Sequence, residues 1–314
     1  MNIRKKITVL IPAYNESASI PALVDALENL SANLPDYEWE YLFVNDGSRD
    51  NTLKVLSDLR PGHPNLNYLN LSRNFGKENA LLAGMDFASG DAVIIMDADL
   101  QHPVDTIPEF IKKWEQGFDD VYGNRTNRGK ESWLRKKLSL SYYSFLKKTS
   151  RIEMLPNVGD FRLLDRRVVD TLRSMRETDR YTKGLYCWAG YSKTGVDFEQ
   201  NGRAEGKSSF NFIGLLNLAI DGITGFSTAP LRIATILGLF VSAASFIYLI
   251  YILVKSILYS DPVAGFPTLV CIILFLGGCQ LLAIGIIGEY IGKIFNQSRN
   301  RPVYIAESFN GKKI

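Results

Sequence analysis

Two long apolar runs in the last third of the chain contain no charged side chain, and they limit the fold more than any other feature. They cover residues 233–254 and 266–288. As a helix, a run of about 20 residues crosses the hydrocarbon core of a bilayer. The connecting residues 255–265 include Pro262 and Gly265. We therefore expect a two-helix transmembrane hairpin rather than two buried helices of a soluble core.

The basic residues beside these runs indicate how the hairpin is oriented. Arg232 precedes the first run, and Lys293, Arg299 and Arg301 follow the second, whereas the connection carries only Lys255. Cytoplasmic flanks of membrane helices are enriched in Lys and Arg. We therefore expect a multi-pass protein of the inner (plasma) membrane, with its amino-terminal domain and both termini in the cytoplasm.

Two further segments are expected to lie at the membrane surface. Residues 132–150 mix aromatic and leucine side chains with Arg and Lys, as helices on an anionic surface do. A surface helix that covers the domain core is an equal alternative. Residues 207–230 lead directly into the first span. Gly288 and Gly292 form a small-residue pair that would serve the hairpin or a homo-oligomer, and we expect a homo-oligomer among the partners.

Residues 1–206 alternate short apolar runs with helical patterns, which is typical of a doubly wound, mostly parallel α/β sheet. The expected strands cover residues 7–11, 40–44, 66–71 and 92–96, and the expected helices cover 19–34, 52–59, 79–88 and 106–116. No G-x-G-x-x-G follows the first strand and no G-x-x-x-x-G-K-[ST] occurs, which disfavours dinucleotide-binding and P-loop proteins. The expected divisions are this domain, an interface segment at 207–230, the hairpin at 231–292 and a cytoplasmic tail at 293–314.

Composition excludes several classes of function. The net charge of +3 is too small to indicate nucleic-acid binding. Two histidines, His63 and His102, are too few for a histidine metal site or a Ser-His-Asp triad. The scattered Cys187, Cys271 and Cys279 give neither a disulfide framework nor zinc-ligand spacing, and they indicate a reducing compartment.

Carboxylates follow the expected strands where each strand ends. Glu16 comes after the first and Asp46 after the second, and Asp97 and Asp99 directly follow residues 92–96. The carboxyl ends of parallel strands share one edge of the sheet, where ligands bind. Two carboxylates one residue apart at this edge can hold Mg²⁺ or Mn²⁺, and the ion can bind a diphosphate. Solvated turn acids are the alternative for this triplet taken alone.

Six short motifs extend the pattern. They are IPAYNE at residues 11–16, VNDGS at 44–48, SRNFGKE at 72–78, DADLQ at 97–101, NVGDFRL at 157–163 and GEYIG at 288–292. With the two apolar runs, these motifs resemble the inverting family-two glycosyltransferases of the GT-A fold. Within that family they are similar to the bactoprenol (undecaprenyl-phosphate) glucosyltransferases, which resemble dolichyl-phosphate mannose synthases. The resemblance extends over residues 7–304.

This resemblance implies a doubly wound mixed sheet of the GT-A type and a metal-dependent transfer of glucose from UDP-glucose to undecaprenyl phosphate with inversion. The product would be a β-linked polyprenyl-phosphate sugar for O-antigen or cell-envelope modification, passed to a flippase and a second glycosyltransferase. UDP-4-formamido-arabinose and GDP-mannose are alternative donors. A membrane-anchored nucleotide-sugar sensor is a non-enzymatic alternative. Processive synthases are disfavoured because the chain lacks Q-x-x-R-W and has one hairpin.

The resemblance also implies roles for single residues. Those expected to bind the nucleotide sugar are Pro12, Tyr14, Glu16, Asp46, Lys77, Asp97, Ala98, Asp99 and Gln101. Those expected to bind phosphate or acceptor are Arg125, Arg135, Arg203 and Lys207. Asp97 and Asp99 would hold Mg²⁺ or Mn²⁺, and Asp160 matches the catalytic carboxylate. A phosphate monoester, with a second pKa of about 6, is already largely dianionic at neutral pH. We therefore expect Asp160 to orient acceptor or sugar rather than to act as a general base.

Two of these roles have simpler alternatives. Lys77 would either contact the nucleotide or cap a helix, and Asp46 would either accept from the ribose or cap the helix after its turn. Residues 202–209, rich in Gly and Ser, are expected to form a loop that closes over donor and acceptor.

Overall fold

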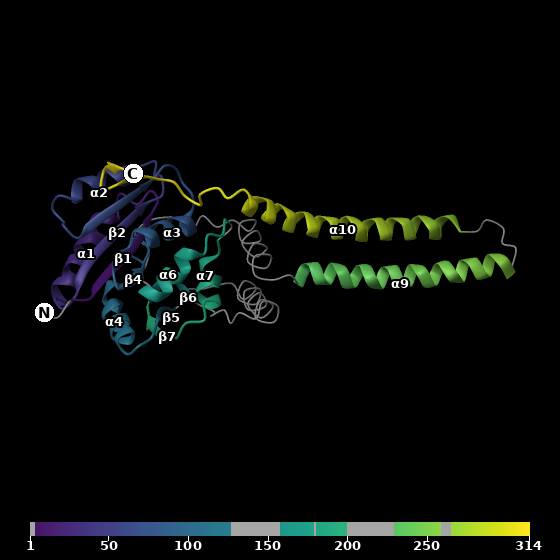
Figure 1. Cartoon of the computed structure of the whole chain (residues 1–314), viewed down its shortest axis with the longest axis horizontal. Helices are drawn as coiled ribbons and strands as arrows, with labels where there is room; N and C mark the ends of the chain where they lie inside the picture. Colours follow the sequence, from purple (N-terminus) through teal and green to yellow (C-terminus); the bar gives the residue numbers. More distant parts are fainter. Residues whose placement is uncertain (1–3, 127–157, 179, 200–228, 259–264) are drawn as a thin grey trace.

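The structure is a computed structural model that describes residues 4–126, 158–178, 180–199, 229–258 and 265–314. Within these residues, strands form a mixed sheet with the order β7-β5-β6-β4-β1-β2-β3-β8-β9. Two long helices extend away from this sheet (Figure 1). The expected interface helix at 132–150 lies outside the described residues, and so does the expected interface segment up to residue 228.

Four parallel strands form the centre of the sheet. In spatial order they are β3 (Leu66–Leu71), β2 (Glu38–Asn45), β1 (Lys6–Ala13) and β4 (Ala92–Ile95). Their apolar residues are buried on both faces, as expected where helices cover both sides of a parallel sheet. In register, Ala13 pairs with Asn45 and Asn45 with Asn70, so these strands end at a common edge.

The strands beyond β4 make the sheet mixed rather than mostly parallel. Strand β6 (Val158–Asp165) runs antiparallel to β4, and β5 (Asp120–Arg125) runs antiparallel to β6. Strand β7 (Lys193–Phe198) is parallel to β5. The antiparallel placement of β6 brings its first residues, which include Asp160, to the same edge as the ends of the parallel strands.

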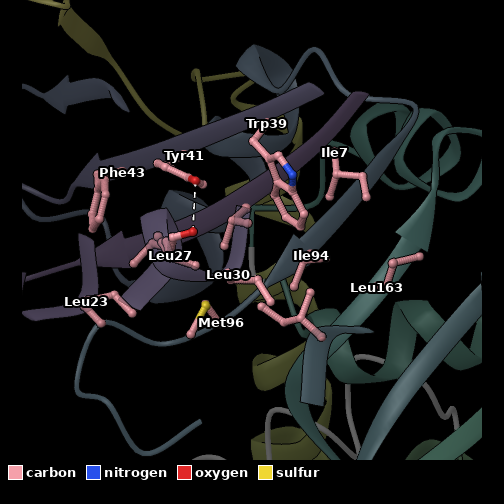
Figure 2. Close-up of a cluster of buried hydrophobic side chains, with 14 of the residues drawn as sticks. Ile7, Leu23, Leu27, Leu30, Trp39, Tyr41, Phe43, Ile94, Met96 and Leu163 are labelled. Carbon is pink, nitrogen blue, oxygen red and sulfur yellow. Dashed lines mark hydrogen bonds between the residues drawn. The ribbon is translucent and has the colours of Figure 1, made fainter. Parts of the chain in front are cut away.

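Helices on each face complete two apolar cores. One face is covered by α1 (Ile20–Asn33), α2 (Thr52–Leu59) and α4 (Ile107–Glu115). The other is covered by α3 (Lys77–Phe87), α6 (Arg166–Ser174) and α7 (Thr182–Trp188). Figure 2 shows the first core, in which the buried Tyr41 hydroxyl donates to the Leu27 carbonyl at 3.0 Å. The cores fix the strands, and therefore the loops at their ends.

Helices α9 (Ala229–Leu258) and α10 (Phe266–Ser298) contain the two expected spans and lie side by side (Figure 1). Within the described residues, one stretch meets the length and hydropathy of a membrane span: Phe275–Ser298, with a mean hydropathy of 1.5 and none of its window buried. The shorter apolar stretch Ala234–Tyr248 lies in α9. This pair of exposed apolar helices indicates association with a membrane.

The residues after α10 do not form a simple tail. They return to the sheet (Figure 1) and form β8 (Ala306–Phe309) and β9 (Lys312–Lys313). Strand β8 runs antiparallel to β3 and β9 antiparallel to β8. Near the end of α10, Gln297 Oε1 accepts from the Thr178 amide at 3.0 Å. The hairpin is thus attached to the sheet through its carboxyl end.

Candidate active site

The loops after β1 and β2 are tied to each other at the sheet edge. The Asn15 amide donates to Ser48 Oγ at 2.9 Å, and Asn15 Oδ1 accepts from the Arg49 amide at 2.8 Å. Asn15 has a φ of 58°, in the left-handed region that Asn tolerates better than most residues. These contacts place Tyr14, which is 40% exposed, and Glu16 next to the turn after β2.

Acidic side chains gather beside this turn. Burial raises the pKa of Glu16, and repulsion by Asp99, Asp97 and Asp50 raises it further, against a hydrogen bond from Ser19. Glu16, Asp97 and Asp99, three of the strand-end acids predicted from the sequence, therefore lie close enough for their charges to repel one another. A bound cation would relieve this repulsion.

Lys77, the first residue of α3, connects two of these acids. Its Nζ lies 2.5 Å from Asp97 Oδ1 and 3.0 Å from Asp160 Oδ2. Burial opposes the charge of Lys77, but attraction to Asp160 and Asp97 outweighs it and raises the pKa of the ammonium group. The positive charge of Lys77 therefore holds together Asp97, an expected metal ligand, and Asp160, the expected catalytic carboxylate.

Asp160 is buried and ionised. Burial alone would raise its pKa, but attraction to Lys77, Lys183 and Arg162 lowers the pKa to about 2. Its Oδ2 faces Lys77, while its buried Oδ1 has no hydrogen-bond partner among the described residues. A buried acceptor without a partner is costly. This oxygen is therefore available to a substrate hydroxyl.

The turn after β4 fixes both acids of the DADLQ motif. The backbone amide of Gln101 donates to Asp99 Oδ1 at 3.2 Å, and the side-chain Nε2 of Gln101 donates to Asp99 Oδ2 at 2.7 Å. Leu100, between these two residues, has a φ of 61°. The Asp97 amide donates to His102 Nδ1 at 3.0 Å. Burial lowers the pKa of His102, so its ring is neutral and accepts through Nδ1. The role of His102 was missed because the histidines were considered only as metal ligands or a triad base.

Asp46 accepts hydrogen bonds from two backbone amides of the loop before α3. Its Oδ1 accepts from the Phe75 amide at 2.7 Å and its Oδ2 from the Gly76 amide at 2.9 Å. The helix-cap interpretation is wrong, because the N-cap of α2 is Asn51. Burial raises the pKa of Asp46, and the two amides oppose the shift. Asp46 holds the loop that ends at Lys77; a ribose contact stays a prediction.

The other predicted residues lie around this centre or outside the described residues. Pro12 is in β1 and pairs with Val44, and Ala98 is buried between the two acids. Arg125 ends β5, and its Nη2 lies beside Gly159, 3.5 Å from where a Cβ on that glycine would be. The basic residues outside the described part of the chain are Arg135, Arg203 and Lys207.

Two charged residues of the SRNFGKE and NVGDFRL motifs have supporting roles that the sequence did not reveal. Arg162 pairs with Asp120 at 2.9 Å and donates to the Gly159 carbonyl at 3.0 Å, which fixes the start of β6. Glu78 accepts from the Thr182 amide at 3.0 Å and so ties α3 to α7. Burial, and after it repulsion by Asp160, raises the pKa of Glu78.

The donor set fits a hard divalent cation that is shared with a ligand. Among the described residues, no group of three or more His, Cys, Asp or Glu side chains is arranged to hold a metal by itself. Mg²⁺ commonly takes one or two carboxylates and completes its shell with water and substrate phosphates. Asp97 and Asp99 are two such carboxylates on one turn, and their charges raise the pKa of the nearby Glu16.

Comparisons with known proteins identify the family of the chain. The family model described as glycosyl transferase family 2 matches residues 8–173, and the one described as GtrB C-terminal hairpin matches residues 229–294. The bactoprenol glucosyl transferase of Shigella phage SfV is 42% identical over 96% of this chain and 98% of its own length. The prophage bactoprenol glucosyl transferase homolog of Escherichia coli (strain K12) is 41% identical over 96% of this chain and 98% of its own length.

Among solved structures, a mannosyltransferase from Pyrobaculum calidifontis, in complex with GDP-Man and Mn²⁺, is 18% identical. It matches 77% of this chain and 65% of its own, with a TM-score of 0.46. The two family matches and the full-length relatives decide the assignment. The chain belongs to glycosyl transferase family 2 and is a glycosyltransferase of the GT-A fold that ends in a GtrB-type hairpin.

Proposed function

We propose that this glycosyltransferase transfers glucose from UDP-glucose to undecaprenyl (polyprenyl) phosphate with inversion, and that the β-linked product serves O-antigen or cell-envelope glycan modification. The observation that carries the proposal is the bridge from Asp97 through Lys77 to Asp160, at 2.5 Å and 3.0 Å, on a chain with an apolar hairpin. The names of the full-length relatives support the lipid acceptor and the sugar.

The residues divide the chemical work as follows. Asp97 and Asp99 would hold Mg²⁺ or Mn²⁺, which when bound supplies positive charge to the departing diphosphate. Lys77 keeps Asp160 ionised and in place. Asp160 would accept a hydrogen bond from a sugar hydroxyl through Oδ1, which has no partner among the described residues, and so orient the sugar rather than the dianionic acceptor phosphate. The acceptor phosphate is largely dianionic at neutral pH, so its oxygen attacks without prior removal of a proton by Asp160.

The membrane part of the proposal concerns delivery of the acceptor. We propose that α9 and α10 cross the inner membrane as a hairpin, with the catalytic domain and both termini in the cytoplasm. Residues 132–150 and 207–230 would lie at the membrane surface, where Arg125, Arg135, Arg203 and Lys207 bind phosphate. A homo-oligomer, a downstream flippase and a second glycosyltransferase complete the proposed partners.

The test is transfer of labelled sugar in membranes that contain the full-length protein. Undecaprenyl phosphate is supplied with UDP-glucose, UDP-4-formamido-arabinose or GDP-mannose, one donor at a time. We expect label from UDP-glucose alone in the lipid fraction, with a β anomeric configuration by NMR, and none with the double variant Asp97→Asn/Asp99→Asn. Label from another donor would overturn the sugar assignment, and label in a water-soluble polymer would overturn the acceptor assignment.

A further inference from the structure

The strand that follows the hairpin contributes a side chain to the network beneath the nucleotide loops. Strand β8 pairs with β3 so that Asn70 is opposite Ser308, the residue after Glu307. Glu307 Oε2 accepts a hydrogen bond from Asn70 Nδ2 at 2.7 Å. Glu307 is itself exposed. Its carboxylate is thus the first, solvent-exposed member of a series of hydrogen-bonded side chains that continues into the sheet.

The contact continues across two strands. Asn70 Oδ1 accepts from Asn45 Nδ2 at 2.7 Å. Asn45 Oδ1 then accepts from the Ser48 amide at 3.3 Å. Asn70 is 7% exposed and Asn45 is 2% exposed. Buried amides interact strongly, so a change at one end of such a chain affects the orientation of the groups that follow.

This series of hydrogen bonds ends at the turn after β2, which is tied to the loop after β1; these two loops, residues 14–16 and 46–49, are called the nucleotide loops. Ser48 receives the amide hydrogen of Asn15 on its Oγ, and Arg49 donates its amide to Asn15 Oδ1. Tyr14 and Glu16 flank Asn15, and Asp46 lies two residues before Ser48. The orientation of the Asn45 side chain therefore bears on both loops.

The Glu307 carboxylate, which can only accept, and the Ser48 backbone amide, which can only donate, fix the orientation of the two side-chain amides from opposite ends. Asn70 must turn its NH₂ group towards Glu307, which leaves its Oδ1 for Asn45. Asn45 then turns its own NH₂ outward and its Oδ1 towards the Ser48 amide. An amide side chain with no such partner can be reversed, because it carries both donor and acceptor groups.

We propose that Glu307 is a positioning residue for donor binding: it orients Asn70 and Asn45 so that the Ser48 turn, and with it the Asn15 loop, is held in its binding form. This inference rests on the proposed function only for the nucleotide that is bound. The segment after the hairpin would then support the donor site through its contact with β3.

The test compares substitutions at two tail residues in the purified full-length protein. Glu307→Ala removes the acceptor, Glu307→Gln retains one through Oε1, and Asn310→Gly is the matched control. Asn310 belongs to the same tail and binds β3 at the Tyr68 amide and Asn67 Oδ1, both at 2.9 Å, away from the Asn70–Asn45 contact. Its φ of 49° suits glycine, so this control removes the contacts without backbone strain.

Binding of UDP and GDP is measured by calorimetry, and exchange of amide hydrogens in residues 14–16 and 46–49 is measured by mass spectrometry. We expect Glu307→Ala to weaken UDP binding about 5- to 10-fold, the loss of roughly one hydrogen bond, and to speed exchange in both loops. Glu307→Gln should restore most of the affinity. Asn310→Gly should leave both readouts unchanged, even if it lowers the melting temperature.

Equal effects of Glu307→Ala and Asn310→Gly on UDP affinity and loop exchange, or unchanged loop exchange in Glu307→Ala, would overturn the positioning role. The segment after the hairpin would then only cover the edge of β3. Failure of the proposed function has a different signature. A wild-type protein that binds GDP but not UDP would overturn the donor assignment, while loop exchange would still test Glu307.

Discussion

Lys77 Nζ lies 3.0 Å from Oδ2 of Asp160, which joins the first turn of α3 to the start of β6. The two residues are far apart in the chain, and the antiparallel placement of β6 brings them together. The pair also has a chemical role, because Asp160 is buried and its low pKa depends on the nearby positive charges.

Replacing Lys77 by Met keeps most of the apolar stem and removes the charge. Asp160 then remains buried without its main counter-charge, so we expect kcat to fall at least 10-fold. The measurement is steady-state transfer at saturating donor. Lys112→Met is the matched control, since Lys112 forms an exposed pair with Glu109 at 3.7 Å. Exposed pairs contribute little, and the control should retain full activity. Equal activity of both variants would contradict the role of Lys77.

The pH dependence follows from the pKa of Asp160. The folded protein lowers this pKa from 3.8 to about 2. Asp160 is therefore ionised throughout the neutral range, and we expect kcat to be flat from about pH 7 to 9. Its contribution to the stability of the fold is likewise fully present above the pKa of the unfolded chain, and it is lost only as the pH falls through the pKa of the folded protein. A kcat limb that rises through the neutral range, and is absent from the residual activity of Asp160→Asn, would show a general base instead.

The expected metal ligands Asp97 and Asp99 can be tested by measuring metal binding directly. We expect Asp97→Asn/Asp99→Asn to weaken Mn²⁺ binding in the presence of UDP, followed by electron paramagnetic resonance of free Mn²⁺, and to lower kcat at least 100-fold. Chelation should abolish wild-type activity, and added Mn²⁺ or Mg²⁺ should restore it. Asp105→Asn, an exposed acid just after the same turn, should change neither readout. Full activity after chelation would contradict a metal requirement.

The turn that contains Gly47 is sensitive to a single methyl group. Gly47 has a φ of 61°, and a Cβ there would collide with the backbone of Arg73 and Asn74. We expect Gly47→Ala to lower the free energy of unfolding by about 2 kcal/mol or more and to weaken UDP binding, because the displaced segment leads to Lys77. Stability is measured by denaturant unfolding.

The control for this substitution separates backbone strain from collision. Gly117 has a φ of 97°, and a Cβ there would meet nothing within 4 Å. Gly117→Ala should therefore cost only the strain of the left-handed backbone, roughly 1 kcal/mol, and leave UDP binding unchanged. Equal losses of stability in the two variants would show that the close approach of Gly47 to Arg73 is unimportant.

The sequence predicted the central sheet well because continuous apolar runs and strand-end turns are local signals. The expected strand at residues 66–71 agrees with β3 and the expected helix at 52–59 with α2. The edge that carries Asp97 and Asp99 was predicted for the same reason. The residue pattern alone indicated a mostly parallel sheet, because the antiparallel pairing of β6 is not encoded in any local pattern; the mixed sheet was expected from the family resemblance and is confirmed.

Contacts between distant segments could not be predicted in the same way. The bridge from Lys77 to Asp160 and the two amides held by Asp46 depend on which loops meet, and periodicity does not carry that information. Strand β8 was missed because its residues AESF are short and only partly buried, so they lack the apolar run of a central strand. The segment was therefore expected to be only a tail.

The place of β8 in the chain has a consequence for the order of assembly. A ribosome makes the catalytic core first, both hairpin helices next and β8 after them. Until that last segment emerges, β3 presents an unpaired edge, which is prone to wrong pairing with other strands. The sheet is thus finished only after the hairpin has been synthesised, so a chain that stalls before this point leaves an open template for aggregation.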